Sequence, residues 1–573
     1  MLTQDNILIG QMLVKENVIS SFQLDQALRE QQQHGQFICS ILVAMGFAAE
    51  EKIFNILSHQ LNIPYVNLRS VTIDPAVIQK IPATFVSHYK IMPVEIKDNF
   101  LIIAMVNPLD VRIVDDLRLL LNIDVKGVLS GEKEINDAIR RYYGVGAGTI
   151  ERIISEQDVF RPAAAEEENV QNVDGAGEDA SIITFVNQVL AEAIKDRATD
   201  IHLEPFQDEL RVRFRIDGVL YETQIPEKIS LFHPAIVSRL KVMAHLNIAE
   251  RRLPQDGRIK LKINGGELDV RISTLPTAFG EAVHIRLLNT RFFLGLENLG
   301  LSSEDRAIIE KVIAQPHGIL FVTGPTGSGK TTSLYACLAK INSGAVKIIT
   351  IEDPIEYQLR GINQMQVVSQ IGFSFATALR HMLRHDPDVM MVGEVRDFET
   401  AEIAIRSALT GHFVFSTLHT NDAAGAVTRL LDMGIEPFLV SSSLECLIAQ
   451  RLVRVICSHC KTPVNSAVRT EILQHMKQMN LVHPSSDFYE GKGCEACRFT
   501  GYKGRTGIYE ILIVTEPIRD LILKRASSQE IKQKAVEEGM RSLRHDGLLK
   551  VCQGITTITE VMRITQQLES SEY

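Results

Sequence analysis

The clearest chemical signal in this sequence is a glycine-rich run between a strand pattern and a helix pattern. The run fits the spacing GxxxxGK(S/T) and consists of Gly324, Pro325, Thr326, Gly327, Ser328, Gly329, Lys330, Thr331 and Thr332. Glycines let backbone N–H groups close around phosphate oxygens, and the first turn of a helix favours a bound anion. We expect Lys330 to reach the outer phosphates of a nucleoside triphosphate and the Thr331 hydroxyl to bind Mg²⁺. A glycine-rich turn without a ligand is the alternative, which the flanking strand and helix disfavour.

Acidic residues follow two of the strand patterns. Glu394 comes after the apolar run 389–392, and Glu352 and Glu356 come after the run 348–351. The carboxyl ends of parallel strands meet at one edge of a sheet, where ligands bind. An acid there can hold Mg²⁺ through water or orient the attacking water. Glu394 is the first candidate for that role and Glu352 and Glu356 are the next. Solvated loop acids are the alternative.

Two histidines, His412 and His419, bracket the apolar run 413–417. A histidine at a strand end can sense the outermost phosphate of a nucleotide and pass the signal along the chain. It can equally be a structural histidine with its hydrogen bonds satisfied. His419 is the candidate for the functional role.

Four of the eight cysteines form two closely spaced pairs. Cys457 and Cys460 make the first pair, and Cys494 and Cys497 make the second after a gap of 33 residues. Two such pairs supply four thiolates to one tetrahedral zinc ion, and a site without an open coordination position is structural. The gap is longer than the usual ~15–20 residues, so we expect a helical insert between the pairs. Redox-active cysteines are the alternative.

Composition limits the classes of protein to which the chain can belong. The 573 residues are 45% hydrophobic, and 60 basic against 70 acidic residues give a net charge of −10. This balance argues against a protein that coats nucleic acid. The longest clean apolar run, 100–106, is too short to cross a membrane, and the first residues lack the pattern of a signal peptide. We therefore expect a cytoplasmic protein.

The elements that must position these residues divide the chain into five regions. A helical pattern near the start recurs after 29 positions, as Leu24, Leu28, Gln31 and then Ile53, Leu57, Gln60. Short apolar runs separated by turns predict α/β domains, and an acidic stretch rich in alanine and glycine predicts a flexible linker. The regions are a helical repeat 1–65, a small α/β domain 66–145, the linker 146–180, a second α/β domain 181–290, and a parallel-sheet domain 291–573 with the cysteine insert 457–497.

Taken in order, the motifs resemble those of a known family, the bacterial traffic ATPases of type IV pilus assembly and type II secretion. The motifs are the phosphate loop, an acidic box at 351–357, the segment 386–394 and a histidine box at 416–420. Two further segments, 199–205 and 215–218, are similar to the family's second N-terminal domain. The four cysteines are similar to those of members that assemble or export, whereas retraction motors are shorter and lack them.

The resemblance implies a RecA-like core that hydrolyses ATP with Mg²⁺ and forms a homohexameric ring. It implies that the ring turns an inner-membrane platform protein, which adds pilin subunits to a filament, while the ATPase stays peripheral to the membrane. Glu394 matches the family's catalytic acid and His419 its histidine-box residue. Arg258, Arg271 and Arg286 match positions where arginines approach the phosphates; a solvated sheet face is their alternative.

Type IV pilus assembly is the function that we expect, and type II secretion of folded proteins is the close alternative. A hexameric nucleic-acid translocase is an alternative from another class, because the same core drives helicases. The acidic net charge and the lack of a segment that combines aromatic and basic residues count against it, so we expect no nucleic-acid partner. A nucleotide-binding regulator with little turnover is a third alternative, although acids at two strand ends favour hydrolysis.

The N-terminal repeat resembles a tandem motif with which some members of this family bind cyclic di-GMP. That motif opens each half with Arg-Leu-Gly, whereas the halves here open with Leu8-Ile9-Gly10 and Phe37-Ile38-Cys39. Both arginines are missing, and each would contribute a charge-assisted contact of roughly 1.5–3 kcal/mol to a phosphate. We therefore expect a helical docking module that has lost most of its affinity for cyclic di-GMP.

Overall fold

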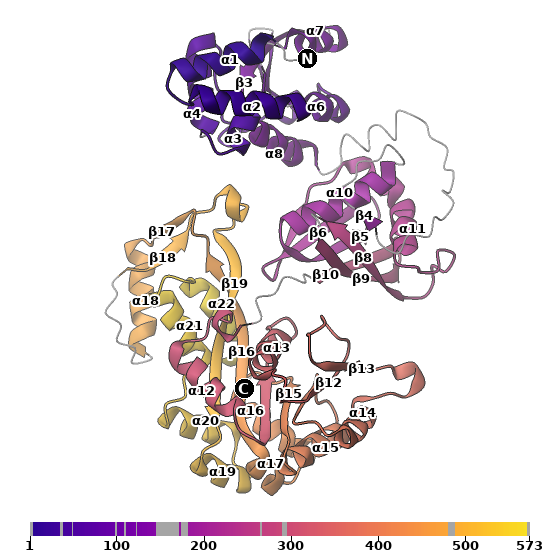
Figure 1. Ribbon diagram of the computed structural model, residues 1–573, viewed down its shortest axis with the longest axis vertical. Helices are drawn as coiled ribbons and strands as arrows, with labels where there is room; N and C mark the ends of the chain where they lie inside the picture. The colour runs from indigo at the N-terminus through magenta and orange to yellow at the C-terminus, as the bar shows by residue number, and fades with distance from the viewer. Residues whose placement is uncertain are drawn as a thin grey trace. The chain divides into compact units, whose positions relative to one another are not determined.

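The computed structural model divides the chain into two compact units, Met1–Leu288 and Asn289–Tyr573, and Figure 1 labels their elements. It describes residues 4–34, 38–48, 50–97, 100–107, 110–121, 123–144, 171–172, 181–263, 266–288, 295–478 and 487–569. Phe37 and the predicted linker 146–180 lie outside these residues, apart from Gln171–Asn172, which form the short strand β4. The predicted α/β class is confirmed.

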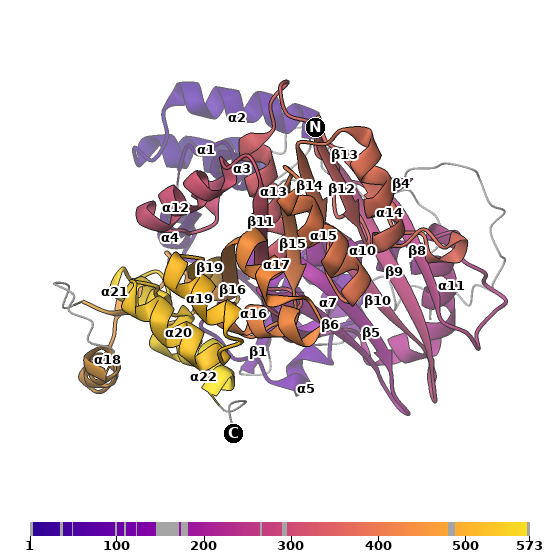
Figure 2. The ribbon, with the colours of Figure 1, turned by 90° about the horizontal axis from the view of Figure 1, so that it is seen from below.

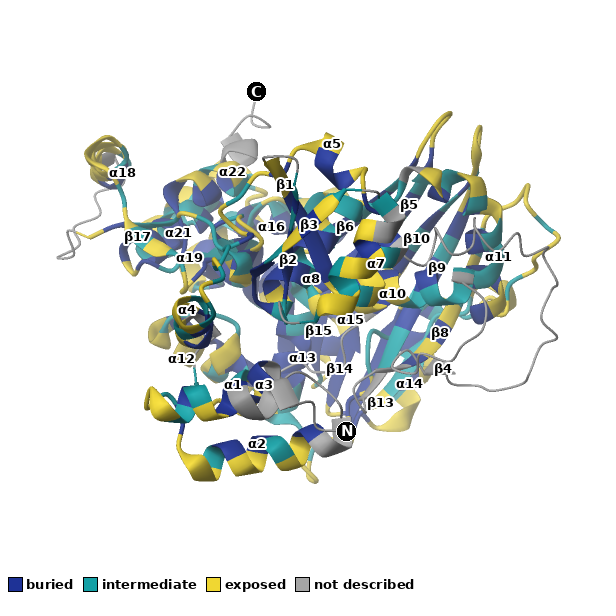
Figure 3. Cartoon of the chain, turned by 90° about the horizontal axis from the view of Figure 1, so that it is seen from above, coloured by how far each residue is buried: buried dark blue, intermediate teal, exposed yellow. Residues whose placement is uncertain are grey.

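Helices open the first unit, as the repeat predicts. They are α1 (Gln4–Lys15), α2 (Ser21–His34), α3 (Ile38–Ala44) and α4 (Glu50–Leu61). Leu24 and Ile53, which occupy equivalent positions of the repeat, are both buried in one core. The other face of α2 is exposed, as Figure 3 shows in yellow. This division into two faces is typical of amphipathic helices that pack together.

A small three-stranded sheet follows the helices. Its strands lie in the order β1 (Ile91–Lys97), β2 (Phe100–Met105) and β3 (Asp124–Leu129), with β1 antiparallel and β3 parallel to β2. The parallel pair requires a crossover, which the helix α7 (Val111–Leu121) provides. The remaining helices of this part are α5 (Pro75–Ile78), α6 (Ala83–Tyr89) and α8 (Glu132–Tyr143).

The second α/β part of this unit contains a larger, mostly antiparallel sheet. Its order is β4-β8-β9-β10-β5-β6-β7, and residues of α10 (Ser181–Lys195) and α11 (His233–Met243) share its core. Buried and half-buried residues alternate along β6, as the period of two predicts. The strands are β5 (Ala198–Pro205), β6 (Leu210–Ile216), β7 (Val219–Thr223), β8 (Gln255–Ile263), β9 (Gly266–Thr277) and β10 (Gly280–Leu288).

The second unit is built on a seven-stranded sheet with buried central strands. The order is β13-β12-β14-β15-β11-β16-β19, and all neighbours are parallel except β16 and β19. Parallel strands joined by helices must be covered on both faces, and the sheet separates two cores accordingly. The strands are β11 (Gly318–Thr323), β12 (Ile348–Glu352), β13 (Asn363–Gln366), β14 (Val389–Val392), β15 (Phe413–Leu418), β16 (Leu444–Ile456) and β19 (Tyr502–Ile513).

Helices from both sides complete this unit (Figure 2). Residues of α12 (Ser303–Ile313) and α13 (Lys330–Ile341) pack in one core. The opposite core holds residues of α14 (Phe375–Met382), α15 (Phe398–Leu409), α16 (Ala423–Asp432) and α17 (Pro437–Ser443). The chain ends with α19 (Glu516–Leu523), α20 (Ser528–Glu537), α21 (Leu543–Cys552) and α22 (Ile558–Glu569).

A small insert lies between β16 and β19, at the place where the cysteine spacing predicts one. It consists of β17 (Lys461–Pro463), α18 (Ser466–Gln478), β18 (Tyr489–Gly491) and the short 3-10 helix Glu495–Cys497. Strands β17 and β18 form an antiparallel pair. The insert therefore contains the helix that the long gap between the cysteine pairs implies.

Candidate active site and metal centre

The predicted phosphate loop joins β11 to the first residue of α13, so it lies at the carboxyl edge of the sheet. Gly327 and Gly329 have φ of 80° and 88°, which favours glycine. A Cβ atom at Gly324 would lie 2.6 Å from the carbonyl oxygen of Gln450, and one at Gly329 would lie 2.8 Å from the Gln450 side-chain nitrogen. Close packing against β16 thus requires glycine at positions 324 and 329, and the backbone conformation favours it at positions 327 and 329.

Lys330 lies over this loop. Its Nζ donates hydrogen bonds to the carbonyl oxygens of Gly324, at 2.7 Å, and Pro325, at 3.2 Å. Burial lowers the pKa of Lys330 to about 8; the charge of Glu394 opposes this shift and that of Arg451 adds to it. A bound polyphosphate would supply the negative charge that a buried ammonium favours.

Ser328 contributes a second group that fits a nucleotide. Its side chain is only 4% exposed, and its hydroxyl has no hydrogen-bond partner among the described residues. Buried hydroxyls are normally hydrogen-bonded. Because Ser328 belongs to the phosphate loop, a phosphate oxygen is a suitable acceptor. The residues of the loop therefore fit ATP.

Glu394 and His419 come from different strand ends and lie close together. Glu394 follows β14 and His419 follows β15, and one Glu394 carboxylate oxygen lies 3.5 Å from the His419 Nε2. The other oxygen pairs with Arg396 at 2.6 Å, while the Glu394 side chain is 13% exposed. Arg396 is a neighbour that motif reasoning missed. The sequence indicates this ion pair only through the position of Arg396, two residues after Glu394.

Hydrogen bonds join the strand ends that carry these motifs. The Thr323 hydroxyl, at the end of β11, donates to the carbonyl oxygen of Thr420 at 2.8 Å. The Thr417 hydroxyl donates to the carbonyl oxygen of Gly393 at 2.8 Å. The phosphate loop, Glu394 and the segment around His419 are thus held along one edge of the sheet, as parallel topology predicts.

Glu352 lies at the end of β12, but its carboxylate is already occupied. The side chain is 3% exposed and accepts hydrogen bonds from the hydroxyls of Tyr335 and Thr350 and from the amide of Gln364. Burial, followed by the charge of Glu352, raises the pKa of the Tyr335 hydroxyl. Such a network holds β12, β13 and α13 together. Glu356 is half-buried in the segment after the strand.

The three predicted arginines share one row of the first unit. Arg258 on β8 is opposite Arg271 on β9, which is opposite Arg286 on β10. Arg286 donates to a carboxylate oxygen of Asp200 at 2.9 Å, and His284 lies 3.0 Å from the same oxygen. Burial raises the pKa of Asp200, but hydrogen bonds led by that from His284 outweigh burial and hold this pKa below its usual value. The alternation of residue types predicts strands, but the row arises only from their register.

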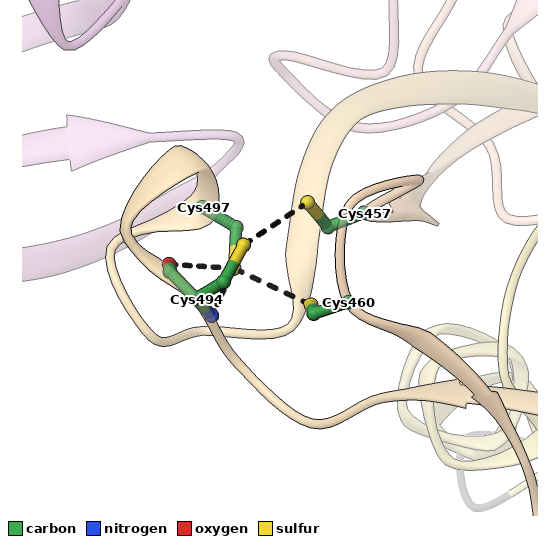
Figure 4. Close-up of side chains that lie close together, drawn as sticks. All are labelled: Cys457, Cys460, Cys494 and Cys497. Atoms are coloured by element: carbon green, nitrogen blue, oxygen red, sulfur yellow. Dashed lines mark hydrogen bonds between the residues drawn. The ribbon is translucent and has the colours of Figure 1, made fainter. Parts of the chain in front are cut away.

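The four predicted zinc ligands come together, as Figure 4 shows. Their Sγ atoms lie within 4.8 Å of one another, and the Cys457–Cys494 and Cys460–Cys497 sulfur pairs are each 3.8 Å apart. Zn–S bonds of about 2.3 Å in a tetrahedron require sulfur separations of about 3.8 Å. The cysteines therefore fit a structural zinc ion.

Backbone N–H groups favour a thiolate at Cys497. The N–H groups of Cys494 and Gly501 donate to the Cys497 sulfur at 3.2 and 3.3 Å. Burial raises the pKa of Cys497, but these hydrogen bonds, together with those from the Cys494 and Cys460 side chains, outweigh burial and bring this pKa down to about 7. Burial instead raises the pKa values of the Cys460 and Cys494 thiols. A Cβ atom on Gly491 would lie 2.0 Å from the carbonyl oxygen of Gly501, so glycine is needed where the two cysteine loops approach.

Comparisons with known proteins agree with this geometry. Residues 175–563 match the family model of the type II/IV secretion system protein, and residues 61–149 match that of the MshEN domain. The chain is 44% identical to the type IV pilus assembly ATPase PilB of Myxococcus xanthus, over 97% of this chain and 98% of the relative. It is 40% identical to the type II secretion system protein E of Xanthomonas campestris, again over 97% and 98%.

A third relative has a higher identity over a shorter stretch of the chain. The type II secretion system protein E of Pseudomonas aeruginosa is 51% identical over 68% of this chain and 76% of its own length. The chain therefore belongs to the type II/IV secretion system family and is an ATP hydrolase, as predicted. Within the described ranges, the longest apolar helices fall short of what a membrane crossing requires.

Proposed function

We propose that this chain is the cytoplasmic ATPase motor of type IV pilus assembly. It acts as a homohexamer at the inner face of the inner membrane and drives a platform protein there. The observation that carries the proposal is the near full-length match to a type IV pilus assembly ATPase, whose 44% identity exceeds the 40% of the secretion relative with the same coverage. Deletion of the gene in its host should abolish surface pili and leave secretion of folded exoproteins intact.

Type II secretion is the second candidate, because the identity to a type II secretion protein rises to 51% over 391 residues. The same deletion strain distinguishes the two. Loss of secreted exoproteins with normal pili would assign the chain to secretion. Genes for pilins and a retraction motor beside this gene would support pilus assembly.

The proposed chemistry uses the carboxyl edge of the ATPase sheet. Lys330 binds the outer phosphates, and the Thr331 hydroxyl is the ligand that the chain offers to Mg²⁺. Glu394 accepts the proton of the attacking water, since its carboxylate is held beside the loop by Arg396 and His419. His419 reports the state of that carboxylate to the segment that leads into α16.

The remaining predicted residues have supporting roles in this proposal. Arg258, Arg271 and Arg286 present a row of positive charge that suits phosphates. Glu352 maintains the strand end through its hydrogen bonds, and Glu356 lies in the segment that follows. Point variants of Arg271 and Arg286 should lower hydrolysis if the row meets nucleotide, and should leave it unchanged if the row is a solvated face.

The N-terminal helices serve as a docking module in this proposal and have lost most affinity for cyclic di-GMP. The missing arginines of the repeat support it, as does Cys39, which is buried where the motif has glycine. Calorimetry of the full-length protein with cyclic di-GMP should give no binding at low-micromolar concentration. Binding at that level would contradict the proposal and direct attention to Lys15 and Arg29.

A further inference from the structure

Strand β16 lies directly behind the phosphate loop. The Gln450 side-chain oxygen accepts a hydrogen bond from Ser333 in the first turn of α13, at 2.7 Å. Next to it, an Nη atom of Arg451 lies 2.9 Å from the place that a Cβ atom on Gly324 would occupy. Gln450 and Arg451 thus pack closely against the loop at Gly324, whereas Thr326 of the same loop is exposed to solvent.

Arg451 is a buried cation with neutral hydrogen-bond partners. Its residue is 6% exposed, and its guanidinium donates to the backbone carbonyl oxygens of Gln450, at 3.1 Å, and Asn421, at 2.9 Å. Within the described ranges, no carboxylate forms an ion pair with it; Glu510 and Asp422 affect it only at longer range. Since a buried charge is costly without a counter-charge, the group favours an anion nearby.

Arg451 also holds the turn that follows the histidine box. It donates to the carbonyl oxygen of Asn421, while Glu510 on β19 accepts a hydrogen bond from the N–H of Ala423 at 2.9 Å. Asp422, between them, pairs with Lys532 at 3.0 Å. The cationic Arg451 and the acidic Glu510 therefore hydrogen-bond to the two ends of one short turn. This turn connects His419 to α16.

We propose that Arg451 is a positioning residue that couples the phosphate loop to the turn after His419. Its planar guanidinium bridges the β16 backbone and Asn421, and its charge adds to the positive potential at the phosphate loop. Bound polyphosphate supplies a counter-charge for the Arg451 guanidinium. This charge tightens the hydrogen bonds of the guanidinium to the carbonyl oxygens of Gln450 and Asn421. The inference rests on the proposed nucleotide-binding role of the loop.

Two substitutions separate the charge of Arg451 from its shape. In Arg451→Gln, both are lost, so KM for ATP should rise and kcat should fall, each by about tenfold, because misplaced groups cost up to ~10²-fold. In Arg451→Lys, the charge remains but a single ammonium does not reproduce the rigid fork. KM should then return to within about threefold of wild type while kcat stays about tenfold low.

Arg454 on the same strand supplies the matched control. It forms an ion pair with the buried Glu560 at 2.9 Å and stacks on Tyr502, in contacts that do not involve the phosphate loop. Arg454→Gln should lower the melting temperature of the full-length protein but keep kcat and KM near wild type when assayed well below that temperature. A structural role for Arg451 would instead make its variants behave like this one.

Three results would overturn the proposal. If folded Arg451→Gln has wild-type kcat and KM, Arg451 positions neither the phosphate loop nor the turn after His419. Recovery of kcat together with KM in Arg451→Lys would leave only a charge effect. The same kinetic pattern in Arg454→Gln would make it a general consequence of damage to β16. Lys330→Ala, assayed in parallel, tests the nucleotide role of the loop separately, because retained hydrolysis there would contradict the proposed function whatever Arg451 does.

Discussion

The phosphate loop packs against β16 and the cysteine centre begins where β16 ends, yet the two sites are made rigid in different ways. The loop is supported by β16 through Gln450, whose atoms leave no room for a Cβ at Gly324 or Gly329. The cysteine centre begins at Cys457, directly after β16 ends, and its loops meet through four sulfur atoms. One site therefore depends on close packing in a large core, and the other depends on an ion. Substitutions in the loop should therefore reduce hydrolysis, whereas substitutions in the cysteine centre should release the ion and lower stability.

The largest expected effect follows from Lys330→Ala. Hydrolysis should fall by at least about a hundredfold, because the variant removes the charge that stabilises the developing negative charge on the phosphates. The fold should persist, since among the described residues the Lys330 ammonium donates only to two carbonyl groups of its own loop. Steady-state ATPase assays and thermal melts of the same preparation check both statements. A large drop in melting temperature would show that Lys330 also supports the packing of the loop.

Glu394→Gln should separate binding from turnover. The amide keeps the shape of the side chain but does not accept a proton, so kcat should fall by about 10²–10⁴-fold while ATP still binds. Fluorescent-nucleotide titration and single-turnover hydrolysis provide the measurements. Near-normal turnover would move the role to another acid, with Glu356 as the first alternative because Glu352 is held in hydrogen bonds.

Cys460→Ser should release the metal and loosen the insert without abolishing nucleotide binding. A structural zinc ion contributes several kcal/mol of folding free energy, so the melting temperature should fall. Affinity for ATP should change by less than about tenfold, because the loop is supported by the core rather than by the ion. Elemental analysis should find one zinc per chain in the wild type and none in the variant. Wild-type protein purified without chelator and free of zinc would disprove the assignment.

The smallest effect is a proton taken up with the nucleotide. The pKa of Lys330 is about 8 in the free protein, and phosphates raise it, so binding at pH 8 should take up about half a proton. Because the folded-state pKa is below the usual Lys value, the free protein should gain stability as the pH rises from about 8 towards 10.5, while ATP binding weakens. Calorimetry in buffers of different ionisation enthalpy measures the uptake. Lys330→Arg, which stays charged, should show none.

Motifs that depend on neighbours in the chain could be predicted from the sequence. The phosphate loop, the acid after β14 and the cysteine pairs each carry their spacing within a few residues, and the apolar runs beside them indicate strands. Contacts between the loop and residues far away in the sequence could not be predicted. Gln450 and Arg451 reach the loop from more than a hundred residues away, and ordinary strand alternation around them gives no sign of it.

The surroundings of Glu352 and of the three arginines could not be predicted either, because they too depend on residues far apart in the sequence. Glu352 is recognisable as an acid after a strand, but its partners Tyr335 and Gln364 belong to α13 and β13. The arginines lie on recognisable strands, but only the register of β8, β9 and β10 aligns them. Pairings between strands depend on the whole sheet, and no local pattern encodes them.

Lys330 bears on how quickly nucleotide can be exchanged. Its ammonium donates hydrogen bonds to the carbonyl oxygens of Gly324 and Pro325, so an arriving nucleotide must compete with these internal partners for Lys330. Capture should therefore proceed through a first-order rearrangement and level off at high nucleotide concentration. When product departs, the ammonium regains these partners at once. We expect this return to stabilise the protein between turnovers.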